Sequence, residues 1–430
     1  MITSIKGFSD ILPEEVGAWQ RVESVARRVF KAYNFAEIRI PILEKTELFS
    51  RSIGETTDIV EKEMYTFEDR DRLDQGRTSD RVATSRLTLR PEGTAGVVRA
   101  YVEAEMYKSE PARKLYYMGP MFRRERPQKG RMRQFHQIGA EALGRADPFI
   151  DAEILLLLSD LFAALKLTEL SLELNSLGDA ECRPSYRDKL LAFLKAREES
   201  LCANCRRRID RNPLRALDCK EPGCIAATQD APSILDALCA PCRMHFDTVQ
   251  KLLAQTGVRY SLNPRMVRGL DYYCRTTFEW TTTQLGSQSA VAAGGRYDGL
   301  VEQLGGPPIP GVGFAMGVER LTMLLKMHEE ASPTGPDVYL VWVGENARNW
   351  AFPMAHRLRQ KNLVVEMEGE SRSLKSQMRR ADKFKAAAVL IVGDDELAKG
   401  EAVLRDMASK RQENVKLENI EANLSARKAG

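Results

Sequence analysis

The 430-residue sequence lacks several motifs that commonly bind nucleotides or carry out catalysis. It has no GxxxxGK(S/T) loop and no GxGxxG directly after an expected strand, which argues against a P-loop or a Rossmann dinucleotide site. HExxH and GxSxG are absent, and the four histidines are scattered, so a histidine-ligated catalytic metal and a hydrolase nucleophile are not indicated. Any nucleotide must therefore be held by side-chain cations and a strand face.

Long apolar runs and a strong charge imbalance are also missing. No apolar run approaches the roughly 20 residues that span a bilayer, and MITSIKGFSDILPEE lacks the basic-then-apolar order of a signal peptide. We therefore expect a soluble, cytoplasmic protein with no membrane partner. Because 64 Lys and Arg oppose 60 Asp and Glu, binding of a polyanion would depend on local basic patches.

Cysteine is unevenly placed, with six of the eight residues between Cys202 and Cys242. In the absence of a secretory signal, this favours a reducing compartment and thiols or metal ligands over disulfides. Two CxxC pairs have the spacing of zinc knuckles, so a candidate structural Zn²⁺ site comprises Cys202, Cys205, Cys239 and Cys242. Cys219 and Cys224 lie between the pairs, so the sequence does not decide which four would ligate. Buried free thiols are the alternative.

The length predicts two or three domains. Residues 1–326 are expected to form one core, interrupted at 176–260 by an insertion of short helices. MHEEASPTGP, residues 327–336, has the composition of a linker. From 337 to 430, strands alternate with helices, which predicts a compact α/β domain with a partly parallel sheet.

The most informative stretch runs from Lys114 to Leu143. Its ends alternate in character and predict two paired strands, whereas its middle is a basic loop suited to phosphates. On the second strand, one face would carry Phe135, Gln137, Gly139 and Glu141, which is a poor core face and a plausible pocket floor. A solvated basic loop is the alternative.

Other candidates lie elsewhere in the chain. Glu92 and Thr94 follow a turn, residues 268–273 belong to an expected strand at 267–282, residues 293–299 form a glycine-dense turn, and Arg320 opens a helix. Arg123 and Arg320 suit phosphate, although either could be an ordinary ion-pairing arginine, and Phe135 could be a core residue. The remaining acceptors and hydroxyls suit a donor-rich ligand such as an amino acid: Glu92, Thr94, Gln137, Glu141, Tyr273 and Tyr297.

Five segments carry a specific resemblance. YNFAEIRIPILE, FRRERPQKGRMRQFHQIGAE and GFAMGVER resemble the first, second and third motifs of class II aminoacyl-tRNA synthetases. RGLDYY and AGGRYDGL resemble segments peculiar to the histidyl-tRNA synthetases. The match keeps the family's order and runs through nearly the whole chain.

The resemblance implies ATP-dependent attachment of L-histidine to tRNA(His) through a histidyl-adenylate, with Mg²⁺. It implies a catalytic domain with an antiparallel six-stranded sheet flanked by helices, a mostly helical insertion that leans on the acceptor arm, and a C-terminal anticodon-binding α/β domain. It also implies a homodimer with Pro41 near the interface.

The resemblance further assigns residue roles. Arg123 and Arg268 would act on the α-phosphate as the catalytic residues. ATP would be held by Arg123, Glu125, Arg131, Phe135 and Arg320. Histidine would be held by Glu92, Thr94, Gln137, Glu141, Arg268, Tyr272, Tyr273 and Tyr297. The tRNA would meet Lys129 and Arg133 of the basic loop, and a basic helix face comprising Arg372, Lys375, Arg379 and Lys383. A solvated helix surface is the alternative for that face.

The segment 69–86 is longer than the resemblance leads us to expect, and either a lid or a passive excursion would fit it. A regulatory subunit of ATP phosphoribosyltransferase would share the fold without charging tRNA. Such paralogues usually lack the C-terminal domain and have degraded catalytic segments, both of which are intact here. A non-enzymatic tRNA-sensing module would have no need for Arg123, Arg268 and Arg320 together.

Overall fold

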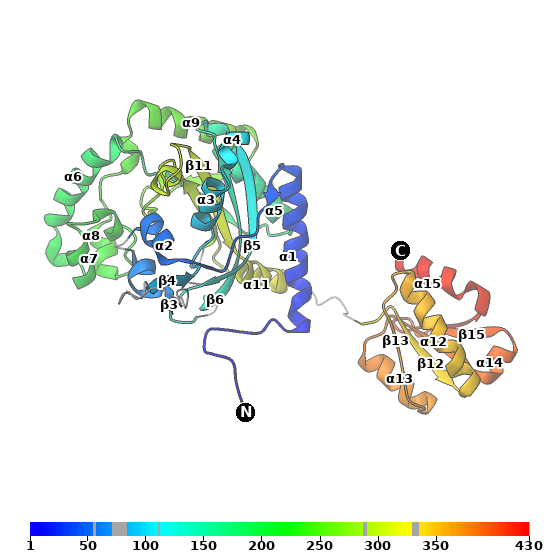
Figure 1. Cartoon of the computed structure of the whole chain (residues 1–430). Coiled ribbons are helices and arrows are strands. Elements are labelled where there is room, and N and C mark those ends of the chain that lie inside the picture. The colour runs from blue at the N-terminus through cyan, green and yellow to red at the C-terminus, as the bar shows by residue number, and fades with distance from the viewer. Residues whose placement is uncertain are drawn as a thin grey trace, which may run out of the picture. The chain divides into compact units, whose positions relative to one another are not determined.

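The computed structural model describes residues 1–54, 57–70, 84–110, 112–128, 130–286, 290–328 and 335–429. The chain divides into two compact units, Met1–His328 and Glu329–Gly430 (Figure 1). Lys129, residues 71–83 of the long polar segment and most of the expected linker lie outside the described residues. No helix in the described ranges is long and apolar enough to cross a membrane.

The first unit is built on one mixed sheet of eight strands, so the expectation of an antiparallel six-stranded sheet was wrong. The six inner strands do pair antiparallel, but a short strand is added in parallel at each edge. These edge strands are only two and three residues long. The order is β1 (Ala36–Glu37), β5 (Arg113–Phe122), β6 (Gln134–Leu143), β11 (Gly311–Gly317), β10 (Ala290–Arg296), β9 (Cys274–Thr281), β7 (Ser171–Ser176) and β8 (Tyr260–Leu262).

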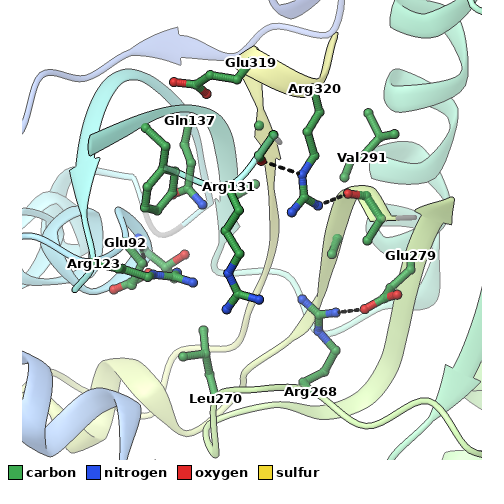
Figure 2. A pocket seen from close by; sticks show the side chains of 18 of the residues that line it. Glu92, Arg123, Arg131, Gln137, Arg268, Leu270, Glu279, Val291, Glu319 and Arg320 are labelled. Atoms are coloured by element: carbon green, nitrogen blue, oxygen red, sulfur yellow. Dashed lines mark hydrogen bonds and ion pairs between the residues drawn. The ribbon is translucent and has the colours of Figure 1, made fainter. Parts of the chain in front are cut away.

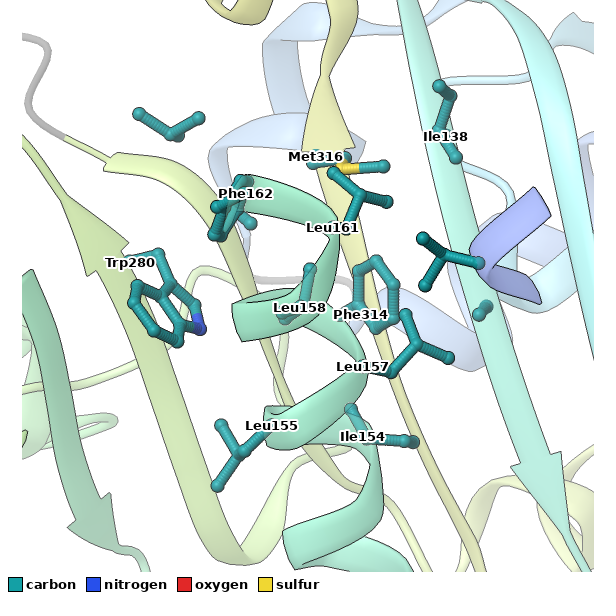
Figure 3. Packing of buried hydrophobic residues seen from close by; sticks show 14 of the residues in the cluster. Ile138, Ile154, Leu155, Leu157, Leu158, Leu161, Phe162, Trp280, Phe314 and Met316 are labelled. Atoms are coloured by element: carbon teal, nitrogen blue, oxygen red, sulfur yellow. The ribbon is translucent and has the colours of Figure 1, made fainter. Parts of the chain in front are cut away.

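One face of this sheet is covered by helices that share its main core. They are α1 (Pro13–Ala32), α5 (Pro148–Ala164), α9 (Ala240–Gln255) and α11 (Val318–His328). Helix α5 is rich in apolar residues, and its Leu158 and Leu161 pack beside Phe314 of β11 (Figure 3). Each such fully buried side chain contributes about 1.5–3 kcal/mol of transfer free energy. This layer holds the strands that carry the pocket on their opposite face.

Smaller elements pack on that opposite face. They are the helices α2 (Thr46–Ile53), α3 (Thr94–Glu103), α4 (Met106–Ser109) and α10 (Leu300–Gln303), the π-helix η1 (Ile59–Glu63), and a second sheet ordered β2 (Leu43–Lys45), β4 (Thr84–Leu89), β3 (Tyr65–Arg70). Helix α3 begins directly after the predicted turn at Pro91–Gly93. Because β3 and β4 pair, both ends of the long polar segment 69–86 are strands, not loop.

The region expected to be an insertion is helical, with one helix of 14 residues and five of three to six residues. They are α6 (Cys182–Lys195), η2 (Glu198–Ser200), α7 (Ala203–Arg208), η3 (Pro213–Ala216), α8 (Pro222–Ala227) and η4 (Ile234–Ala237) (Figure 1). They enclose a small separate core that includes Tyr186, Leu190 and Leu194. Helix α9 closes the insertion and returns the chain to the main core.

Two local expectations were wrong. Residues 267–273 are loop and turn, and the strand begins only at Cys274. The glycine-dense segment 293–299 is largely the end of strand β10. An added Cβ at Gly294 would lie 2.2 Å from the backbone oxygen of Gly313, so close packing against β11, rather than a turn, requires glycine there.

The second unit is a five-stranded, partly parallel sheet with helices, as predicted. The order is β13 (Val365–Met367), β12 (Val338–Val343), β14 (Ala388–Gly393), β15 (Glu401–Asp406) and β16 (Gln412–Lys416). The first three are parallel and the last two antiparallel. The helices are α12 (Glu345–Gln360), α13 (Leu374–Lys383), α14 (Asp394–Ala398), η5 (Leu417–Asn419) and α15 (Ile420–Ala429).

Candidate active site

A cavity of about 320 Å³ lies on the sheet face opposite α5 (Figure 2). Strands β6, β9, β10 and β11 contribute its floor and walls, together with the loops before α3 and β9. The predicted ATP- and histidine-binding residues that line it are Glu92, Thr94, Arg123, Glu125, Arg131, Phe135, Gln137, Arg268, Tyr272, Tyr273 and Arg320. Residues nearly 230 positions apart in sequence, Glu92 and Arg320, thus share one cavity.

Three arginines converge at one end of the pocket. The Nε of Arg123 donates to the Pro91 carbonyl at 2.8 Å, and its guanidinium lies 5.3 Å from the centre of the Phe135 ring. Arg131 forms an ion pair with the buried Glu125, and Arg320 donates to the carbonyls of Gly130 and Ala290.

The electrostatics of this end favour a polyanion. Burial lowers the pKa of Arg320, and the neighbouring charges of Arg131 and Arg123 lower it further. Burial likewise lowers the pKa of Arg123 and of Arg131. Phosphate oxygens would relieve this repulsion and satisfy the bidentate guanidinium donors.

Arg268 lies on the opposite wall, facing these arginines across the cavity (Figure 2). It forms an ion pair with Glu279 of β9, and its guanidinium lies 5.3 Å from the centre of the Tyr273 ring. A partly exposed carboxylate and an aromatic face therefore fix the direction in which this cation points.

The other end of the pocket is built from acids and hydroxyls that bond to one another. The Glu92 carboxylate accepts from the backbone N–H groups of Thr94 at 2.7 Å and Ala95 at 2.9 Å, which caps helix α3. The Thr94 hydroxyl donates to Glu141 at 2.7 Å, and the Tyr297 hydroxyl donates to the other Glu141 oxygen. Burial raises the pKa of Glu141 to about 8, although these two donors lower it.

Glu141 and Tyr297 do not line the cavity; both are buried beside it. Gly139 also differs from the expected bare floor, because an added Cβ there would meet the Tyr117 ring at 2.3 Å. The glycine makes room for an aromatic ring instead of for a ligand. Phe135 and Gln137, on the same strand face, do reach the cavity.

Several polar atoms at the pocket are buried without a hydrogen-bond partner in the described part of the chain. They are the Gln137 Oε1, the Arg268 Nε and the Tyr272 hydroxyl. Unpaired buried polar groups are costly, so these atoms indicate a ligand that presents both donors and acceptors.

Two pocket carboxylates were missed from the sequence. Glu319 accepts from the His136 backbone N–H at 2.8 Å and contacts its ring Nδ1 at 3.1 Å. Its place directly before Arg320 was the available signal. Glu279 carried no signal, because an acid in an alternating strand normally faces solvent.

A second acid–base network explains Arg296 of AGGRYDGL. Its buried guanidinium pairs with the buried Asp151, which also contacts His245 Nε2 at 2.7 Å. The network ties strand β10 to helices α5 and α9. Arg296 therefore stabilises the fold, whereas Tyr297, next to it, donates to Glu141 beside the pocket.

The four cysteines named for a zinc site do not come together in the structure. The structure groups Cys202 and Cys205 with Cys219 and Cys224, and it groups Cys239 and Cys242 with Asp179 and Cys182. The two CxxC pairs thus belong to different clusters. All eight cysteines are free thiols.

None of the predicted tRNA contacts that the structure describes lines the pocket. Arg133 donates to the Glu125 carbonyl at 3.2 Å and the Lys6 carbonyl at 3.4 Å, so its side chain holds the N-terminal segment. In the second unit, Lys375, Arg379 and Lys383 are exposed on α13. Arg372 precedes that helix, contrary to expectation, and pairs with Glu370 at 3.3 Å.

The comparisons with known proteins agree over the whole chain. The family model Histidyl-tRNA synthetase matches residues 7–321, and the model Anticodon binding domain matches residues 337–427. A histidine–tRNA ligase of Syntrophotalea carbinolica is 55% identical over 100% of this chain and 99% of its own length. One from Trichlorobacter lovleyi is 58% identical over 97% and 96%. The apo histidyl-tRNA synthetase of S. aureus has a TM-score of 0.80 at 32% identity, covering 99% of this chain and 100% of its own.

This catalytic sheet, its arginine-lined pocket and an anticodon-binding module define a class II aminoacyl-tRNA synthetase. Both family models and the relatives cover the two units in the same order. The chain belongs to the histidyl-tRNA synthetase family.

Proposed function

We propose that this chain attaches L-histidine to tRNA(His) with ATP, through a histidyl-adenylate, and releases AMP and pyrophosphate. Family membership and full-length relatives named histidine–tRNA ligase support the proposal. The observation that carries it is the pocket itself. Three arginines meet at one end, acids and tyrosines at the other, and Arg268 faces both.

Within this proposal, the phosphate end takes ATP. Arg123 holds the α-phosphate, and Phe135, whose ring centre lies 5.3 Å from the Arg123 guanidinium, stacks on adenine. Arg131 and Arg320 hold the outer phosphates, and Glu125 fixes Arg131 while facing the base.

The opposite end takes histidine. The unpaired Gln137 Oε1, with Glu92 and Thr94, accepts the α-ammonium group. The Arg268 Nε is free to donate to the carboxylate. Tyr273 and the Glu141–Tyr297 pair read the imidazole, and Tyr272 closes the wall through its contact with Tyr297, 5.7 Å between ring centres.

The chemistry follows from this placement. A histidine carboxylate is ionised at neutral pH, so its attack on the α-phosphate needs no general base. It needs alignment with the leaving pyrophosphate and cations on the developing charge, which Arg123 and Arg268 supply from opposite walls. The terminal ribose hydroxyl of tRNA then attacks the adenylate.

Mg²⁺ is expected with ATP, and the pocket offers hard oxygen donors for it in Glu279 and Glu319. Magnesium usually takes one or two carboxylates together with substrate phosphates, so this donor set fits. When bound, the ion would neutralise charge on the pyrophosphate oxygens.

Selectivity would come from hydrogen bonding. A site built to bond a polar side chain rejects analogues that leave its buried groups unpaired, and typical penalties reach about 10⁴-fold. The buried Tyr272 hydroxyl, which has no hydrogen-bond partner in the described part of the chain, would incur such a penalty with an apolar amino acid.

The proposal includes two macromolecular partners and a cytoplasmic location. The basic face of α13, with Lys375, Arg379 and Lys383, would contact the tRNA backbone. A homodimer would cover the exposed Ile42 and Leu43, 44% and 43% exposed, beside Pro41. None of the eight cysteines forms a disulfide, which suits a reducing compartment.

Two assays on the full chain test this function. Histidine-dependent ATP–pyrophosphate exchange should occur without tRNA, and histidine should be transferred to tRNA(His). A regulatory subunit would bind histidine without either activity, and a tRNA-sensing module would bind tRNA without exchange.

A triple variant, Lys375→Ala, Arg379→Ala and Lys383→Ala, separates the tRNA contact from the chemistry. It should raise the KM for tRNA about 10-fold, because each cation that contacts a tRNA phosphate contributes to the affinity. ATP–pyrophosphate exchange should stay unchanged. The matched control replaces Lys399 and Lys410, also exposed in the second unit, with alanine. Equal effects of the two variants would contradict the assignment of this face.

A further inference from the structure

The insertion contains two compact groups of metal-type ligands. In the first, comprising Cys202, Cys205, Cys219 and Cys224, and in the second, comprising Asp179, Cys182, Cys239 and Cys242, the ligand atoms all lie within 4.8 Å of one another. The Cys202 and Cys219 sulfurs are 3.9 Å apart. A tetrahedral Zn²⁺ with Zn–S bonds of about 2.3 Å places its sulfurs about 3.8 Å apart, so this spacing fits one ion.

The second group has the same geometry with one oxygen ligand. The Asp179 carboxylate oxygens lie 3.0 Å from the Cys242 sulfur and 3.9 Å from the Cys239 sulfur. The first distance is from Oδ2 and the second from Oδ1. On one zinc, a carboxylate oxygen and a thiolate sulfur would lie about 3.6 Å apart, which is compatible with a group whose ligand atoms all lie within 4.8 Å of one another. We propose that the insertion binds two structural Zn²⁺ ions, one in each group.

The surrounding backbone supports thiolate ligands. The N–H of Cys202 points to the Cys224 sulfur at 3.1 Å, and the N–H of Cys239 points to the Cys182 sulfur at 3.1 Å. Such donors are the outer contacts that orient ligands and spread their charge. Cys182, Cys205, Cys224 and Cys242 are at most 5% exposed, which suits closed structural sites.

The first site compensates for weak local structure. From Glu198 to Ala237 the helices have three to six residues each, and they share a small core. Isolated helices this short are not stable, and segments of this size usually need a metal or disulfides. The first zinc would join η2, α7, η3 and α8 into one unit.

The second site connects the insertion to the catalytic pocket. Asp179 follows β7, and its Oδ2 lies 3.5 Å from the Arg275 guanidinium, which would balance a negatively charged site. Gly178 has φ +62° and bonds through its carbonyl to the Arg275 N–H at 2.7 Å. Arg183, on the neighbouring helix, donates to the Tyr273 carbonyl. The second zinc thus lies behind the pocket wall that carries Tyr273.

Metal analysis of the full chain, expressed with zinc and purified without chelator, tests the proposal. We expect two equivalents of zinc per chain. Cys202→Ser with Cys205→Ser should retain one equivalent, and so should Cys239→Ser with Cys242→Ser. Cys274→Ser is the matched control, because Cys274 belongs to neither group, and it should retain two.

If a variant fails to fold, measurements on the wild type decide the proposal. Titration of the wild type with a mercurial should release two equivalents of zinc to a chromogenic chelator. It should do so in two phases, because the two ligand sets differ. Zinc content of one equivalent or less, in protein that still catalyses exchange and takes up none on incubation with Zn²⁺, would overturn the two-site assignment. Iron at the same stoichiometry would overturn the choice of metal.

Discussion

At the amino-acid end of the pocket, Glu92, Thr94, Glu141 and Tyr297 already satisfy one another through hydrogen bonds. At the phosphate end, Arg123, Arg131 and Arg320 are held by backbone carbonyls and one acid, and they repel each other. The first end is preorganised to recognise a neutral or cationic side chain. The second gains its stabilisation only when an anion arrives, so we expect the two ends to respond differently to mutation.

The largest effect should come where the two ends meet. Arg268→Ala should lower histidine-dependent ATP–pyrophosphate exchange by about 10²–10³-fold, as loss of one transition-state donor typically does. ATP binding, measured directly by calorimetry, should persist. Arg259→Ala, at an exposed arginine of the same unit, is the control. Exchange close to wild type in Arg268→Ala would contradict its bridging role.

Glu141→Gln should act on the amino-acid end alone. We expect the KM for histidine to rise roughly 10- to 100-fold, which corresponds to the loss of a hydrogen bond to a charged group. The KM for ATP should stay within about twofold of wild type, because the arginines are untouched. Glu302→Gln, an exposed acid on α10, is the control. A parallel rise in both KM values would show that the ends are coupled.

Arg320→Ala should give the reverse pattern, with a change in the KM for ATP instead of histidine, and the change should be smaller. The KM for ATP should rise about 10-fold, because one phosphate donor is lost while Arg123 and Arg131 remain. The KM for histidine should change little. Lys326→Ala, further along α11, is the matched control. Lys326 pairs with Glu15, and neither residue lines the pocket.

The smallest effect concerns stability and pH. The folded protein raises the pKa of Glu141 from 4.5 to about 8, so the unfolded chain loses that proton first as pH rises. Wild-type stability should therefore fall, relative to Glu141→Gln, between about pH 4.5 and pH 8. Melting curves at pH 5 and pH 8 should show a Tm advantage of the variant of a few degrees, present mainly at pH 8. An equal Tm difference at both pH values would show that the titration of Glu141 does not cause it.

Much of the site followed from local patterns. The two strands around the basic loop, the helix opened by Arg320 and the partly parallel second unit were all visible as periodicity and turn chemistry. Confirmed elements include β5, β6, α11 and β12. The parallel edge strands of the sheet were not visible in the sequence, because strands of two and three residues carry no periodic signal.

What the sequence alone indicated is the class of chemistry: cations suited to phosphates, acids and tyrosines suited to an amino acid, and cysteines that are either metal ligands or buried thiols. Only the tertiary structure decided how these residues are grouped. It buried Glu141 behind Thr94, turned Gly139 into space for Tyr117, and divided seven of the cysteines into two sets, of which only the second includes Asp179. Residue type sets what a side chain can bond to, but its partners depend on contacts between segments far apart in the chain, which spacing along the sequence does not encode.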